Sequence, residues 1–128
     1  MTAMSDLRRE LARARATAVM AELKDKPAER YLTALLAVGQ TAAVVIAARA
    51  DPARPQRRNL WQVVIEIAPE LGEWAGYFHA LQGKGDAVRA GTTSLVTSRE
   101  ADDLVRDAHA FADLVERRLG VHARRQAC

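Results

Sequence analysis

The sequence has a single cysteine, Cys128, at its last position. No disulfide can therefore close within the chain, and a zinc site of the cysteine–histidine type cannot be built. This cysteine usage fits a reducing compartment, so we expect a cytoplasmic protein. We also expect no cofactor and no bound metal.

Aromatic residues are scarce, at 5% of the chain, whereas 26 of the 128 residues are alanine. Alanine is the strongest helix former, and no segment alternates apolar and polar residues as a strand does. About half of the chain is apolar, which is enough for one domain with a real core. The composition thus favours a single all-α domain over a disordered or β-rich chain.

No hydrophobic run is long enough to span a bilayer comfortably. The longest, ALLAVGQTAAVVIAA at 34–48, has Gln40 and Thr41 inside it. Residues 1–24 mix alanine and leucine with charges and contain no apolar segment of a signal peptide. We expect residues 34–48 to form a buried core helix and the protein to have no membrane association.

Lysine is rare, with 3 lysines against 16 arginines, and the net charge is only +3. The planar guanidinium fits phosphate and stacks on bases, although codon usage in a GC-rich genome produces the same bias. Arg54, Arg57 and Arg58 lie in the loop DPARPQRR (51–58), which two prolines should keep extended. These three arginines are the candidate nucleic-acid-binding residues.

Helical periodicity and punctuation divide the chain into segments. The expected helices cover residues 6–24, 27–50, 60–68, 69–82 and 97–119. Residues 83–96 are expected to be a connection. The predicted fold is an up-and-down bundle of four to five helices, with a core at about 6–119 and a flexible basic tail at 120–128.

Helix ends carry recognisable signals. Asp25 is placed to cap the helix that begins at Pro27, and Asn59 to cap the next one, with Gln62 in capping-box register. Thr97 and Glu100 form a second capping-box pattern, and Gly120 is expected to end the last helix.

The segments AERYLTALLAV (28–38), PELGEWAGYF (69–78) and SREADDLVRDAHAFADLVERR (98–118) resemble a small bacterial branch of the HEPN superfamily. The similarity covers about residues 28–119. The resemblance implies a four-helix core, a homodimer, and association with RNA or nucleotides. Many members are metal-independent ribonucleases of toxin–antitoxin systems, in which an arginine is followed after four to six residues by a histidine.

In such members the histidine acts as acid or base at the ribose 2′-hydroxyl, and the arginine stabilises phosphate charge. Arg117 and His122 have the matching spacing, but Gly120 between them should end the helix and leave the pair unfixed. They are therefore weak catalytic candidates. Members without the pair act as binding or partner modules.

The last helix carries a polar face. Asp102, Arg106, His109 and Asp113 recur at helical spacing, and Arg99 and Asp103 lie beside them. This face is either a pocket for a nucleotide or a partner protomer, or a solvated surface with ion pairs four residues apart. The pairs expected in the second case are Arg99–Asp103, Asp102–Arg106 and Asp113–Arg117.

Our prediction is a non-catalytic HEPN-like binding module that associates with RNA or a nucleotide, as a homodimer or with a protein partner. One alternative is a metal-independent ribonuclease of toxin–antitoxin type. The other is a protein-interaction module without nucleic-acid contact.

Overall fold

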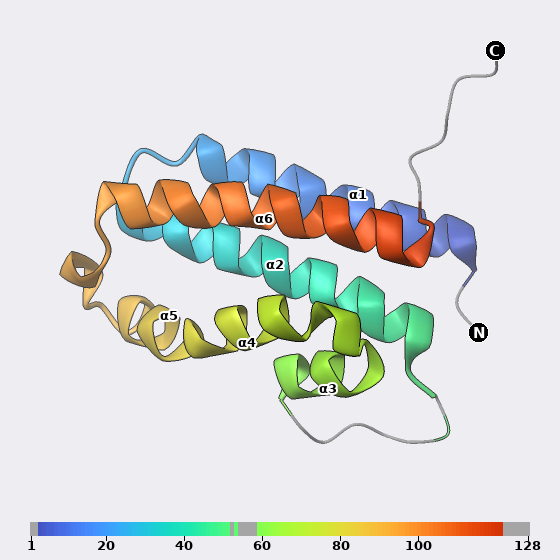
Figure 1. Ribbon diagram of the computed structural model, residues 1–128. Coiled ribbons are helices and arrows are strands. Elements are labelled where there is room, and N and C mark those ends of the chain that lie inside the picture. Colours follow the sequence, from blue (N-terminus) through green and yellow to red (C-terminus); the bar gives the residue numbers. More distant parts are fainter. Residues whose placement is uncertain (1–2, 52, 54–58, 122–128) are drawn as a thin grey trace, which may run out of the picture.

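The computed structural model describes residues 3–51, 53 and 59–121, and within them it is all-α, as predicted. The helices are α1 (Met4–Glu22), α2 (Pro27–Arg49), α3 (Leu60–Ile67), α4 (Gly72–Ala80), α5 (Gln82–Arg89) and α6 (Ser98–Leu119), with short 3₁₀ turns η1 (Pro69–Leu71) and η2 (Thr93–Leu95). Figure 1 shows α1, α2 and α6 as one group of long helices, with α4 and α5 running end to end along α2.

The α2 helix lies in the middle of the bundle and packs against α1, α6, α3 and α5. Its buried side chains include Tyr31, Val38, Thr41 and Val45. Among the described helices, α2 is the one whose length and composition alone would allow it to cross a membrane. The expected core helix is thus observed, because apolar residues on several of its faces find neighbours inside the protein.

A cluster of four aromatic rings joins α3, α4 and α6. Trp61, Trp74, Phe78 and Phe111 have ring centroids 5.0–6.0 Å apart. Tilted and offset rings at this spacing add directional attraction to the burial of their large apolar surfaces. The few aromatic residues are therefore concentrated where the short helices meet the long ones.

The predicted helix ends are largely confirmed. Asn59 caps α3 as predicted, because it accepts a bond from the Trp61 N–H at 2.8 Å, but the expected capping box with Gln62 does not form. The Asn59 amide donates instead to Gln82. The capping box of Thr97 and Glu100 has both bonds, at 3.1 Å each. The prediction for Asp25 is wrong, since the N-cap of α2 is Lys26 and no side chain caps it.

The expected flexible tail from residue 120 onward needs correction at its start. Gly120 ends α6 in the left-handed region with φ 66°, as glycine allows. Val121 is only 1% exposed and packs in a second core cluster with Leu7, Leu11 and Val44. The turn folds the chain back onto α1, so burial of Val121 holds it there. Residues 122–128 lie outside the described part.

The connection expected at 83–96 is wrong in its first half, where α5 forms. Gly83 and Gly85 lowered the helix propensity of this segment. Gly85 is nevertheless buried, and a Cβ on it would lie 2.6 Å from Leu35 Cδ1. Val88 is buried as well, and Lys84 pairs with Glu100 of α6. Close packing on α2 therefore outweighs local propensity.

Replacing the two glycines should separate these effects. A Cβ at Gly83 meets nothing within 4 Å. We expect Gly83→Ala to raise the free energy of unfolding by about 0.5–1 kcal/mol, because alanine is the better helix former. Gly85→Ala should raise it less, or lower it, since Leu35 must move. Urea unfolding of both variants measures the difference. An equal gain at both positions would contradict the close approach of α5 to α2.

Candidate functional site: a polar cleft between α1, α2 and α6

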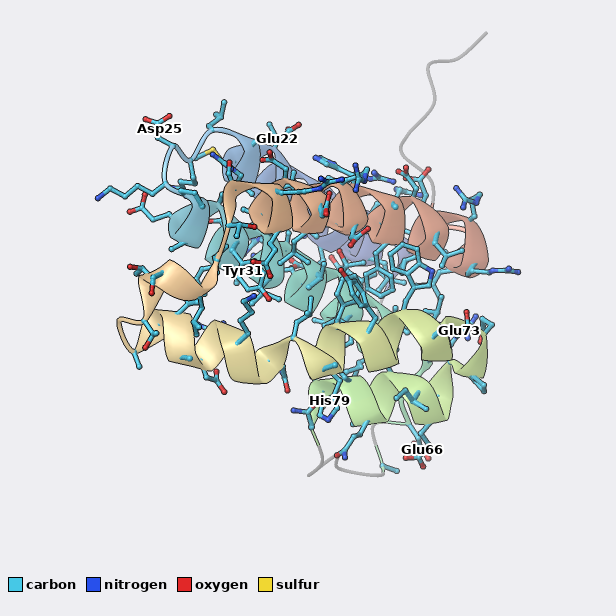
Figure 2. The ribbon with its side chains drawn as sticks, turned by 60° about the vertical axis from the view of Figure 1, so that its left-hand side comes forward. Glu22, Asp25, Tyr31, Glu66, Glu73 and His79 are labelled. Atoms are coloured by element: carbon cyan, nitrogen blue, oxygen red, sulfur yellow. The ribbon has the colours of Figure 1, made fainter. Side chains whose placement is uncertain are left out.

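A solvent-facing cleft of about 400 Å³ opens where the end of α1, the start of α2 and the middle of α6 meet. It is lined by Glu22, Arg30, Asp102, Val105, Arg106 and His109. Figure 2 shows Glu22 beside α6, near the turn that carries Asp25. Five of the six residues are ionisable, and they carry both signs of charge.

The helical repeat explains how α6 supplies most of the lining. Asp102, Val105, Arg106 and His109 are spaced by three or four residues and so share one side of the helix. The neighbouring side of α6 holds Leu104 and Phe111 in the core. Burial of that apolar stripe fixes the rotation of α6 and turns its polar face toward the ends of α1 and α2.

Arg30 joins the three helices at the cleft. Its Nε donates to the carbonyl of Lys24 and its Nη2 to that of Asp25, each at 3.1 Å. Its Nη1 donates to Asp102 at 3.0 Å and to Ser98 Oγ at 3.3 Å. The side chain is only 15% exposed. Because these four bonds engage most of its five N–H donors, Arg30 mainly holds the α1–α2 turn against α6.

His109 lies deeper in the cleft than Arg106. Its side chain is 33% exposed, and Nε2 lies 3.5 Å from a carboxylate oxygen of Glu22. Nε2 itself is buried and makes no hydrogen bond within the described residues. The 3.5 Å separation is too long for a strong bond, so a small shift or a bound group is needed to satisfy this nitrogen.

Arg106 is the most accessible cation of the cleft. Its guanidinium is 74% exposed and pairs with Asp103 three residues earlier, at 2.7 Å. A surface pair of this kind contributes little free energy, at most about 1 kcal/mol. Arg106 can therefore exchange Asp103 for an anionic ligand at small cost.

The structure brings together only part of the predicted polar face. Asp102, Arg106 and His109 line one cleft, whereas Arg99 is exposed and does not line it. Asp103 reaches the cleft only through its bond to Arg106.

The ion pairs expected within the last helix are also replaced by others. Asp102 pairs with Arg30, and Asp113 with Arg15 of α1 at 2.7 Å. Side chains of neighbouring helices approach these two carboxylates, so both form pairs between helices. Asp103 pairs within α6, but with Arg106 and not with the expected Arg99.

Glu22 and Arg30 were missed by sequence reasoning. Each lies at a helix end far from α6 in the chain, and nothing in the local spacing connects them with His109. Only the packing of α1 and α2 on α6, with α1 antiparallel and α2 parallel to it, brings them to the cleft (Figure 1).

Other predicted residues fall elsewhere. Arg54, Arg57, Arg58 and His122 lie outside the described residues. Arg117 is exposed in the last turn of α6, where a cation complements the helix dipole. Within the described ranges, no three histidine, cysteine or carboxylate side chains gather as a metal site would require.

Comparison with protein families places this geometry in context. The family model described as SAV_6107-like HEPN matches residues 21–116. The chain belongs to the HEPN family. The match confirms the predicted membership in the HEPN superfamily. No curated protein and no solved structure matches the chain significantly.

The HEPN match contains the whole cleft, from Glu22 to His109. It excludes most of α1, and it ends before Arg117 and His122. The polar cleft is therefore a feature of the HEPN region itself, whereas the Arg117–His122 spacing lies beyond that region.

Arg30 offers a direct test of how the cleft is held. We expect Arg30→Met to lower the free energy of unfolding by about 1–3 kcal/mol, because two backbone carbonyls and Asp102 lose their donor. Arg30→Lys should recover only part of the lost stability, since a single ammonium lacks the planar, forked set of donors of a guanidinium. Arg106→Met is the control and should change stability by no more than about 0.5 kcal/mol. Urea unfolding measures all three, and equal losses for Arg30→Met and Arg106→Met would refute the bridging role.

Proposed function

We propose that the chain is a non-catalytic binding module of the HEPN family that associates with RNA or a nucleotide through the polar cleft. The observation that carries the proposal is the convergence of Arg106, His109 and Glu22 on one open cleft. Arg106 supplies an exchangeable guanidinium for phosphate, and the partly exposed His109 ring lies in the same cleft.

The two signs of charge in the cleft favour a nucleotide over a bare phosphate. Glu22 and Asp102 provide acceptors suited to ribose hydroxyls and to base amino groups. Val105 adds an apolar contact on which part of a base can lie. A cleft built for phosphate alone would gain nothing from two carboxylates.

The loop arginines give the proposal a second contact for longer RNA. Arg54, Arg57 and Arg58 follow the far end of α2, whereas Arg30 lies in its first turn. The helix rises about 1.5 Å per residue, so Arg30 and Arg49 are about 28 Å apart along α2. A mononucleotide in the cleft is too short to span this length of α2, whereas a strand of RNA is long enough.

We further propose that the protein is a cytoplasmic homodimer. A groove of about 430 Å³ between α2, α3 and α5 lies beside Leu36, whose side chain is 56% exposed. Leu35, Leu36 and Leu60 line this groove together, and a contiguous apolar surface of this kind supports self-association.

Binding should respond differently to the two groups of arginines. We expect Arg106→Gln to weaken both AMP and single-stranded RNA several-fold, since one phosphate contact is lost. Reversing Arg54, Arg57 and Arg58 to glutamate should weaken RNA only. Arg9→Gln is a matched control, because Arg9 is 67% exposed and also pairs with an aspartate three residues earlier. Fluorescence anisotropy with labelled RNA and calorimetry with AMP supply the measurements.

Salt dependence separates RNA binding from the remaining alternative. Phosphate contacts make the affinity fall steeply with salt, by about 0.7 in the log–log slope per contact for single strands. Arg106→Gln should reduce that slope by about this amount. Absence of any RNA or nucleotide binding would favour the protein-interaction module over our proposal.

A metal-independent ribonuclease is the second candidate function, and one observation at the cleft favours it. His109 shares the cleft with two arginines, Arg30 and Arg106. Against it, Arg106 and His109 are three residues apart, short of the HEPN spacing, and most donors of Arg30 are occupied.

Incubation with RNA in the presence of EDTA decides between binding and cleavage. We expect the intact protein to leave total RNA uncut on a denaturing gel. Cleavage that disappears in His109→Ala but persists in His122→Ala would establish a ribonuclease centred on the cleft. Cleavage with the opposite pattern would establish the Arg117–His122 pair instead.

A further inference from the structure

A second hollow, of about 290 Å³, lies between α4 and α6, away from the polar cleft. It is lined by Glu73, Trp74, Tyr77 and Asp107. Two aromatic rings and two carboxylates thus share one opening, and no cation is among its lining residues. Figure 2 shows Glu73 on α4, at the opposite end of the molecule from Glu22 and Asp25.

The two rings are held in place by the core. Trp74 stacks on Phe111 with centroids 5.8 Å apart and planes 23° apart, and it also contacts Phe78. Tyr77 packs on Phe78 at 5.2 Å while remaining 43% exposed. Rings fixed in this way lose little conformational freedom when a ligand binds against them.

Asp107 is also fixed. Its Oδ2 accepts a bond from the Tyr77 hydroxyl at 2.7 Å, which leaves Oδ1 available. Burial and this bond raise the pKa of Tyr77, so the phenol stays protonated and remains the donor. Asp107 therefore presents a fixed carboxylate to the hollow, and no cation lines the hollow to pair with it.

Several carboxylates of η1 and α6 are already paired. Glu100 is bonded to Lys84, Asp103 to Arg106, and Glu70 to Arg49. Glu73 and Asp107 make no ion pair among the described residues, although nearby carboxylates have partners. The hollow thus combines two aromatic rings with two carboxylates that make no ion pair within the described residues.

We propose that the hollow between α4 and α6 binds a guanidinium group, stacked on Trp74 and paired with Glu73 and Asp107. Guanidinium suits the lining better than ammonium does, since its planar fork bonds carboxylates and its face stacks on aromatic rings. The hollow has room for one such group with a short stem. The site is distinct from the nucleotide cleft and does not depend on the proposed function.

Titration with N-acetyl-arginine amide tests the site. We expect a saturable shift of the Trp74 indole N–H resonance in ¹H–¹⁵N NMR spectra, while the resonance of buried Trp61 stays in place. The uncharged citrulline analogue should bind at least tenfold more weakly. Equal shifts with the two ligands, or a linear shift without saturation, would overturn the proposal.

Charge-neutral variants locate the interaction. Asp107→Asn keeps an oxygen that can accept the Tyr77 bond, so the fold should be preserved, and we expect about tenfold weaker binding. Glu73→Gln should act in the same direction. Asp25→Asn is the control, since it removes the same charge from an exposed turn at the other end of the molecule. A control that weakens binding as strongly as Asp107→Asn would show general charge attraction only and refute the site.

The Trp74 resonance also distinguishes the possible sources of the guanidinium group. A neighbouring copy of this arginine-rich chain would shift the Trp74 resonance with protein concentration alone, before any ligand is added. A resonance that is independent of protein concentration and moves with the arginine derivative indicates a free ligand or another protein. Both results support the site, whereas a resonance that responds to neither would overturn it.

Discussion

The burial of α2 is the constraint on which the rest of the structure depends. This helix carries apolar side chains on several faces, so burying one face alone would leave the others in contact with water. It is stable in water only if other helices cover it, and α1, α6, α3 and α5 do so. The short helices α3, α4 and α5, which come after the 51–58 loop, then run along the surface of α2 that α1 and α6 leave uncovered. Even the glycine at position 85 is explained by this demand, because its missing Cβ lets α5 approach Leu35.

Covering α2 also determines where the polar groups meet. The apolar stripe of α6 must face inward, so its polar face is turned toward the α1–α2 turn. Arg30 closes that corner by bonding two carbonyls of the turn and a carboxylate of α6. His109 and Arg106 line the opening of the cleft. His109 lies next to Glu22, and Arg106 makes a weak surface ion pair with Asp103. The cleft thus follows from core packing, and it combines a rigid corner with one exchangeable cation.

The two hollows of the HEPN domain differ in chemistry because they border different parts of the core. The cleft at α1, α2 and α6 is lined mainly by ionisable groups. The hollow at α4 and α6 lies over the aromatic cluster, so rings form its walls and carboxylates its rim. If both proposals hold, this one domain presents an anion-binding and a cation-binding surface at once. Such a two-signed surface suits a module that joins a nucleic acid or nucleotide to a second group.

The sequence by itself determined the helical class, the buried central helix, the capping box at Thr97 and the stop at Gly120, because these depend on composition, periodicity and contacts within one turn. It also placed Asp102, Arg106 and His109 on one helical face. Only the tertiary structure decided that Arg30 and Glu22 join them, that Asp102 and Asp113 pair across helices, and that α5 forms despite two glycines. It likewise set Trp74 and Tyr77 beside Asp107, thirty residues further along the chain from Tyr77. These outcomes depend on which helices pack together, and the free energy of that packing comes from contacts between residues far apart in the chain.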